Sequence, residues 1–257
     1  MSLLSLLRVR LSQGQQAIAD VRTAVPAGFR GRPSLADAAC PDDCHACIAA
    51  CPTPVAAISK APLAIDLGRC VFCAECATAC PEAKITFGES PHMAATSRDG
   101  LTLTAGRPHG DAEARAQVHA SQAFHKLFGR SLKLRQVSAG GCNACELELG
   151  AAANVNFDVS RFGIDWVASP RHADALVLSG TLTRTMRDAV RLCWDAMPEP
   201  RFVVAVGACA ISGGLHEGSR GVDRGFLDDV APALYVPGCP PHPLTFVNAI
   251  LDFLGVP

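Results

Sequence analysis

The pattern of apolar and polar positions changes character halfway along the chain. In the second half, short apolar runs typical of buried strands alternate with longer stretches of helical periodicity. The runs span residues 132–138, 164–168, 173–179, 201–207 and 234–236, and helical patterns cover 183–197 and 244–254. This alternation predicts an α/β domain in which helices cover both faces of an open, mainly parallel sheet.

The pattern at the beginning of the chain is different. Residues 2–13 place Leu3, Leu4, Leu7 and Leu11 on one helical face, with polar residues on the other. Such a helix could lie on a membrane surface or pack on a partner subunit. Packing on a partner is favoured, because a short basic face binds lipid weakly. We assign residues 1–30 to this amphipathic N-terminal segment.

Residues 31–95 hold two cysteine runs and three strand-like pieces, at 56–58, 63–65 and 85–87. The runs are Cys40-x3-Cys44-x2-Cys47-x3-Cys51-Pro52 and Cys70-x2-Cys73-x2-Cys76-x3-Cys80-Pro81. The second run is the bacterial ferredoxin pattern, in which the fourth cysteine ligates the other cluster. The first run has one extra residue after Cys40. The spacing predicts a small α+β, bacterial-ferredoxin-like domain with two [4Fe-4S] clusters; a zinc ribbon rarely duplicates this fourfold spacing.

The two predicted ligand sets exchange their last members. One cluster is assigned to Cys40, Cys44, Cys47 and Cys80, and the other to Cys51, Cys70, Cys73 and Cys76.

A polar, glycine-rich stretch follows at residues 96–130. A helical pattern runs from Asp111 to Gly129. We interpret the stretch as an interdomain linker with one docking helix, and residues 131–257 as the C-terminal domain.

Composition and charge restrict the function. The chain has 257 residues, 49% of them apolar, with 23 basic and 24 acidic side chains, so the near-zero net charge argues against a nucleic-acid partner. Thirteen cysteines without a secretory signal indicate metal ligands in a reducing compartment. No apolar run reaches the roughly 18 residues of a membrane span. The chain lacks a P-loop, a dinucleotide fingerprint and a C-x-x-C-H haem motif, so bond chemistry is expected in another subunit.

A third cluster site is predicted where apolar strands end. Cys142 and Cys145 follow the strand at 132–138, Cys209 follows the strand at 201–207, and Cys239 follows the strand at 234–236. Because ligands of open parallel sheets bind beyond the carboxyl ends of the strands, these segments should converge at one edge. The C-x2-C pair alone leaves zinc about as plausible as iron.

Other groups near this edge have two interpretations each. Arg184 either directs a positive charge at the cluster or is solvated, and Thr183 is a candidate helix cap. Glu146 and Glu148 are explained by the helix dipole, with proton handling by Glu146 as a less favoured alternative. Cys193, in the middle of a helical pattern, is interpreted as a free buried thiol.

Several motifs together resemble a known family. They are Cys142-Asn-Ala-Cys145-Glu146, Ser169-Pro-Arg-His-Ala-Asp-Ala-Leu-Val-Leu-Ser-Gly180, Thr183-Arg-Thr-Met186, Gly207-Ala-Cys-Ala-Ile-Ser-Gly-Gly214 and Val236-Pro-Gly-Cys-Pro-Pro241. They are similar to the small subunit of energy-converting [NiFe] hydrogenases of the formate hydrogenlyase type (group 4), which is homologous to the NuoB-type subunit of complex I (NADH-quinone oxidoreductase). The first half, from Phe29-Arg-Gly-Arg through Cys70-Val-Phe-Cys to Pro81, resembles the two-cluster ferredoxin subunit of the same complexes, so the chain looks like a fusion of two subunits.

The resemblance carries further implications. It implies a flavodoxin-like C-terminal domain and a proximal [4Fe-4S] cluster held by Cys142, Cys145, Cys209 and Cys239. It also implies a hydrogenase or complex I-like large subunit, membrane-anchor subunits and an upstream electron donor or acceptor as partners. The location implied is cytoplasmic, peripheral on the inner face of the cell membrane. Two departures from the complex I pattern, Cys142-x2-Cys145 in place of adjacent cysteines and Ala208 in place of an acidic residue, lean toward the hydrogenase branch.

Three functions are therefore compared. The leading hypothesis is an electron-transfer subunit that relays electrons through three [4Fe-4S] clusters to or from a hydrogenase large subunit. The second is a complex I-like quinone oxidoreductase subunit whose last cluster passes electrons to quinone. The third is a zinc-stapled assembly protein without redox function.

Overall fold

The computed structural model of the chain describes residues 2–129 and 131–256. Positions 1, 130 and 257, which limit three of the four predicted domain ranges, lie outside the described residues.

The C-terminal half is built on a five-stranded parallel sheet. Its strands are β6 (Leu132–Ser138), β7 (Ile164–Trp166), β8 (Ala175–Ser179), β9 (Phe202–Val206) and β10 (Leu234–Val236). Their order across the sheet is β10-β9-β8-β6-β7. Counted along the chain this is the 2-1-3-4-5 order of the flavodoxin fold. The predicted fold class is therefore confirmed.

Helices cover both faces of this sheet. They are α6 (Ala144–Ala151), α7 (Arg187–Asp195), α8 (Gly207–Ser212), α9 (Gly225–Asp229) and α10 (Pro243–Phe253), with short 3-10 turns η2 (Val159–Phe162), η3 (Pro170–His172) and η4 (Gly214–His216). Leu149 of α6 and the apolar side chains of α10 share one core with β6, β8, β9 and β10. Val190 of α7 and Phe226 of α9 pack in a second core on the opposite face. Every residue of β8 and β9 is buried, and both strands are apolar apart from Ser179 at the end of β8.

The N-terminal module consists of small antiparallel sheets and short helices. Strands β1 (Pro33–Leu35) and β4 (Ile85–Phe87) pair with each other, and β2 (Ile58–Lys60), β3 (Leu63–Asp66) and β5 (Thr102–Thr104) form a three-stranded sheet; the helices are α2 (Ala46–Ala49) and α3 (Glu75–Ala79). The strand predicted at 56–58 begins two residues later, and the other two predicted strands lie where the pattern places them. The α+β class of this half is confirmed.

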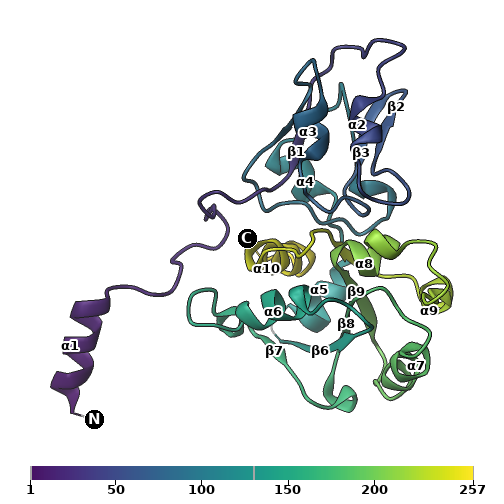
Figure 1. The fold of residues 1–257 in the computed structure, drawn as a ribbon. Helices are drawn as coiled ribbons and strands as arrows, with labels where there is room; N and C mark the ends of the chain where they lie inside the picture. The colour runs from purple at the N-terminus through teal and green to yellow at the C-terminus, as the bar shows by residue number, and fades with distance from the viewer. Residues whose placement is uncertain (1, 130, 257) are drawn as a thin grey trace.

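The two halves are joined by direct pairing of backbone groups. Strand β5, which follows η1 (Asp99–Leu101), still belongs to the N-terminal sheet, where it pairs with β3. The contact between the halves lies just before it in the chain. Ala95 exchanges hydrogen bonds with Tyr235 of the edge strand β10, at 3.1 and 2.9 Å. In Figure 1 the N-terminal module lies above α10 and α8 of the C-terminal half.

The single helix predicted from Asp111 to Gly129 is wrong. The structure has two helices, α4 (Asp111–Ala116) and α5 (Gln122–Phe128). Ser121 caps α5 by accepting a hydrogen bond from the N–H of Phe124. Thr96 binds the segment between the two helices: its N–H donates to the carbonyl of Gln117, and its hydroxyl accepts from the N–H of His119. These tertiary hydrogen bonds replace the intrahelical ones that a continuous helix would have made.

Helix α1 (Leu3–Gln13) stands apart from the rest of the chain (Figure 1). The predicted apolar stripe is exposed, with Leu3, Leu4, Leu7 and Leu11 exposed by 74%, 78%, 52% and 85%. Within the described residues, no helix has the length and apolar character needed to span a bilayer.

Candidate iron–sulfur sites

The structure divides the eight N-terminal cysteines between two cavities. The first cavity is lined by Cys40, Cys44, Cys47 and Cys80. The second cavity is lined by Cys51, Cys70, Cys73 and Cys76. Cys51 and Cys80, the last cysteines of their runs, each border the cavity of the other run, because the chain turns away at Pro52 and Pro81.

Backbone N–H groups point at sulfurs in both cavities. The N–H of Ala57 donates to Cys51 Sγ and the N–H of Lys84 donates to Cys80 Sγ, each at 3.4 Å. The N–H of Phe72 donates to Cys70 Sγ at 3.3 Å. Hydrogen bonds to the sulfurs are one of the means by which proteins tune the potential of an iron–sulfur cluster.

The thiols of the second cavity are poor acids without a metal. Burial, followed by the proximity of the neighbouring thiols, raises the pKa of Cys70 to about 12 and of Cys76 to about 11. Metal binding deprotonates such thiols and supplies the positive charge that offsets their mutual repulsion. Four thiols around an apolar cavity therefore fit a metal cluster better than they fit four free cysteines.

A single metal ion fits less well. Throughout residues 2–129 and 131–256, no group of three or more His, Cys, Asp or Glu side chains is arranged to hold one ion. A [4Fe-4S] cluster has a separate iron for each thiolate, so its four ligands surround a cavity instead of meeting at a point.

The other four predicted ligands come together at the C-terminal edge of the large sheet. Cys142 and Cys145 follow β6, Cys209 lies in α8 directly after β9, and Cys239 lies in the loop between β10 and α10. Burial raises the pKa of Cys145 to about 12, and the nearby Glu146, Cys209, Cys239 and Cys142 contribute to this increase. Cys145 is therefore close enough to the other three cysteines for their charges to affect its pKa. The four cysteines are called the third site below.

Glycine allows the backbone to approach this site closely. Gly207 has φ +86°, and a Cβ there would lie 2.7 Å from Cys145 Sγ. Gly214 has φ +55°, and a Cβ there would lie 3.1 Å from Cys209 Sγ. The space around the sulfurs thus depends on residues without side chains. The glycines were visible in the sequence, but their contacts with the cysteines were not.

The third site is open on one side. Cys142 and Cys239 are exposed, while Cys145 and Cys209 are half-buried.

Glu146 is tied into the same edge by hydrogen bonds. Ser179 Oγ donates to its Oε1 at 2.7 Å. Burial raises the pKa of Glu146, but the hydrogen bonds from Ser138 and Ser179 outweigh it and hold the pKa below its ordinary value. The carboxylate is therefore ionised at neutral pH.

A cation not singled out from the sequence lies beside Cys209. Arg224 donates to the carbonyl oxygens of Cys209, Ala210 and Ile211, at 3.1, 2.8 and 2.9 Å. Burial and the neighbouring cysteines raise the pKa of the Cys209 thiol to about 11, although the positive charge of Arg224 acts to lower it. No motif contains Arg224, so only the fold reveals its position.

Arg184 is exposed, and the structure gives it no hydrogen bond to any of the four cysteines. The pKa of Asp223 is held below its ordinary value by the N–H of Gly225 and by the charges of Arg187 and Arg184. Thr183 does not cap α7, which begins at Arg187 after Met186 without a side-chain cap. Cys193 lies in α7 and is half-buried, with its pKa raised by burial.

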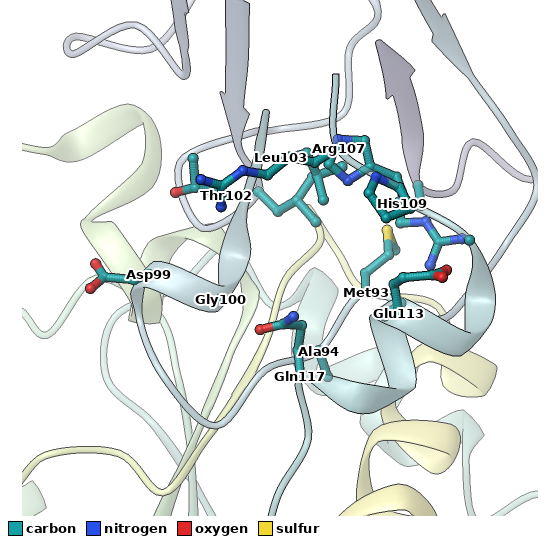
Figure 2. A pocket seen from close by; sticks show the side chains of 15 residues that line it. Met93, Ala94, Asp99, Gly100, Thr102, Leu103, Arg107, His109, Glu113 and Gln117 are labelled. Carbon is teal, nitrogen blue, oxygen red and sulfur yellow. The ribbon is translucent and has the colours of Figure 1, made fainter. Parts of the chain in front are cut away.

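A further cavity contains no cysteine (Figure 2). It lies between β5 and α4, and its lining includes Met93, Leu103, Arg107, His109 and Glu113. None of the predicted ligands borders it.

Comparison with known proteins identifies the C-terminal half. Residues 142–253 match the family described as NADH ubiquinone oxidoreductase, 20 Kd subunit, which binds a [4Fe-4S] cluster. The chain is 37% identical over 127 residues to a probable membrane-bound hydrogenase subunit of Pyrococcus furiosus, covering 49% of this chain and 75% of the relative.

For two other relatives, the alignment with this chain covers a smaller share of the relative. Formate hydrogenlyase subunit 7 of Escherichia coli is 40% identical over 132 residues, 51% of each chain. The chain thus spans about half the length of that relative. A NuoB-type subunit of the NADH-quinone oxidoreductase of Desulfovibrio desulfuricans is 48% identical over 104 residues, which is 40% of this chain and 56% of the relative.

A chain in the structure of the membrane-bound sulfane sulfur reductase, an archaeal respiratory membrane complex, is 26% identical with a TM-score of 0.41. That match covers 52% of this chain and 71% of the other.

Proposed function

The chain belongs, through its C-terminal half, to the family of the NADH ubiquinone oxidoreductase 20 Kd subunit, and we propose that it is the iron–sulfur electron-transfer subunit of a membrane-associated hydrogenase complex. Members of this family are subunits of oxidoreductase complexes. The proposed cofactors are three [4Fe-4S] clusters, two in a ferredoxin-like N-terminal domain and one at the sheet edge.

The observation that carries the proposal is the grouping of twelve cysteines into three sets of four. The first cavity and the second cavity each contain one set. The third site contains the last set, in the segment that matches the 20 Kd subunit family.

The contact between the two halves supports an order for the relay. Gly68, two residues before Cys70, lies so close to α8 that a Cβ on it would be 2.7 Å from Ile211 Cγ2. Ile211 is two residues after Cys209. The second cavity is therefore joined to the third site by packed residues, and we place the second cluster between the first cluster and the third.

The clusters supply one-electron transfer when bound. The residues of this chain hold and shield them: the side chains of Ile58, Ile65 and Phe87 keep water out of the second cavity, and backbone N–H groups stabilise sulfur charge in both N-terminal cavities. At the third site Arg224 provides a fixed positive charge next to Cys209.

The exposed side of the third site is the proposed docking surface for the large subunit. Cys142 and Cys239 are exposed there, and a cluster that exchanges electrons with another subunit must lie close to it. Helix α1 offers a second contact, to a membrane-anchor subunit, through its exposed leucines. This assembly would hold the chain peripherally at the inner face of the cell membrane, with an upstream electron donor or acceptor near the first cavity.

A second function is favoured by one finding. The 48% identity to the relative from NADH-quinone oxidoreductase exceeds the identity to either hydrogenase relative, although over a shorter segment. In that case the third cluster would pass electrons to quinone. The spacing Cys142-x2-Cys145 favours the hydrogenase.

Metal analysis tests the cluster proposal directly. Anaerobically purified chain should contain about twelve irons and about twelve acid-labile sulfides, because each of three cubanes has four of each. About eight irons with an intact ferredoxin-type spectrum would show that the third site holds no cluster. Zinc in place of iron would support an assembly protein.

The complex purified through this chain separates the remaining alternatives. A large subunit with two C-x2-C pairs, together with hydrogen-dependent dye reduction, is expected for the hydrogenase. A large subunit without those pairs, together with quinone reduction, would instead establish the second function.

A further inference from the structure

The two N-terminal cavities share a repeated hydrogen-bond pattern, in which one position holds residues of very different character. In each half, a cysteine followed by proline accepts a hydrogen bond from the N–H of the residue that precedes the next strand. That residue is Ala57 for Cys51 and Lys84 for Cys80, with the same N···Sγ distance of 3.4 Å. Each is followed by a buried isoleucine, Ile58 or Ile85. Ala57 and Lys84 are therefore equivalent positions.

Lys84 is buried in spite of its charge. The residue is 6% exposed and borders the first cavity together with the four cysteines. Its ammonium donates to the carbonyl oxygen of Ala39, a neutral partner, on the loop that leads into Cys40. Buried lysines are rare because desolvation of the ammonium is costly, so a nearby negative charge is expected to offset that cost.

The other charged side chains also make the first cavity more positive than the second. Lys60 also borders the first cavity, and the acidic Glu82 on its rim is exposed, so solvent screens it. The described lining of the second cavity consists, apart from its cysteines, of apolar residues such as Ile65, Val71 and Phe87. Arg30 donates to the carbonyl oxygens of Phe72 and Cys73 outside that cavity and is exposed.

We propose that Lys84 sets an unequal distribution of electrons between the two N-terminal clusters by stabilising the reduced state of the cluster in the first cavity. The proposal rests on the proposed function, because it requires that both cavities hold clusters. The cluster of Cys40, Cys44, Cys47 and Cys80 then has the higher reduction potential, and the cluster in the apolar cavity the lower.

The physical reason is electrostatic. Reduction adds one negative charge to a cluster that is already anionic, and a buried cation stabilises that charge more than a solvent-screened one does. An apolar, uncharged surrounding favours the oxidised, less charged state. In the proposed relay, an electron therefore rests on the first cluster and crosses the second only transiently.

Reciprocal substitutions test the proposal on the full-length chain, purified anaerobically. Lys84→Met removes the charge at similar length, and Ala57→Lys introduces a charge at the equivalent position. The readout is a redox titration followed by electron paramagnetic resonance, with iron content measured on the same samples. Lys126→Met, which removes an exposed lysine from α5, is the matched control.

In the unmodified chain we expect two N-terminal midpoint potentials. Lys84→Met should lower the higher one, Ala57→Lys should raise the lower one, and Lys126→Met should move neither. A fully loaded Lys84→Met variant with both midpoints unchanged would overturn the proposal. If Lys84→Met lost iron, Ala57→Lys would decide: a loaded variant whose lower midpoint did not rise would overturn the proposal.

These outcomes are distinct from a failure of the proposed function. If the unmodified chain bound zinc or lacked the two N-terminal midpoints, the cluster assignment itself would be wrong. If it bound about twelve irons and only the Lys84 and Ala57 variants behaved otherwise than expected, the relay would stand and the role of Lys84 would not.

Discussion

The N-terminal cavities and the third site each group four cysteines, but the chain encloses the two kinds of site to different extents. All eight N-terminal cysteines come from residues 40–80, and each is buried or half-buried within its own module. The third site collects its cysteines from separate loops at one sheet edge and leaves Cys142 and Cys239 exposed. The difference indicates that the N-terminal sites can be closed by this chain alone, whereas the third site requires another surface to cover it.

Removing one ligand from each system should have the largest effect. Cys80→Ser is expected to remove the first cluster, and Cys239→Ser the third, so that iron falls in each case from about twelve to about eight. The consequences should differ. Cys80→Ser blocks electron entry while the large subunit still turns over with an artificial partner, and Cys239→Ser keeps both N-terminal clusters but disconnects them from the active site.

Electron paramagnetic resonance of the two reduced variants, with turnover assays in parallel, measures both effects. A Cys239→Ser variant with three cluster signals and normal physiological turnover would show that the ligand set and the direction of the relay are both wrong.

A smaller change tests how closely the third site is packed. Gly207→Ala adds a Cβ 2.7 Å from Cys145 Sγ at a backbone φ of +86°. We expect loss of the third cluster alone, with a destabilisation of about 2 kcal/mol from the strained backbone. Gly150→Ala, where a Cβ meets no atom within 4 Å, is the matched control and should stabilise α6 by about 0.5 kcal/mol. Iron content and anaerobic urea unfolding measure both; equal iron in the two variants would contradict the close approach.

The features that could be predicted from the sequence are those with local signals. Cysteine spacing predicted sets of four within residues 40–80, and strand–helix alternation predicted the parallel sheet and the edge where Cys142, Cys209 and Cys239 meet. The missed features depend on distant residues. Thr96 interrupts the expected helix after Asp111, and Arg224 reaches Cys209 from a loop without a motif.

The connection between the two regions should also be measurable. Asp252 of α10 accepts hydrogen bonds from Arg22 of the N-terminal segment and from Arg115 of α4, the latter at 3.0 Å. Its side chain is only 8% exposed. Asp252→Asn leaves Arg22 without its charged partner in a half-buried position and should lower the free energy of unfolding by about 3 kcal/mol. Asp229→Asn removes an exposed pair with Arg191 and should cost less than about 1 kcal/mol.

The pH dependence gives a further test of this pair. Burial raises the pKa of Asp252, but the nearby His92 ring, at 3.8 Å, the hydrogen bond from Arg22 and the charges of Arg22 and Arg115 lower it by more. A carboxyl group with a lowered pKa in the folded state stabilises that state above its unfolded pKa, near about 3.9. The stability difference between the unmodified chain and Asp252→Asn should therefore be full at neutral pH and shrink as the pH falls below about 4. A constant difference would mean that packing, and not charge, connects the two regions.

The smallest effect is expected at the thirteenth cysteine. Cys193 lies in α7, which packs on the sheet face opposite α6 and α10, and its thiol neighbours Arg135. Cys193→Ala removes a half-buried sulfur from a helix, so unfolding should change by less than about 1 kcal/mol and iron should remain at about twelve. Cys209→Ala, also half-buried, should lose the third cluster. Loss of iron from Cys193→Ala would indicate that Cys193 is a cluster ligand. The proposed set of four cysteines at the carboxyl edge of the sheet would then be wrong.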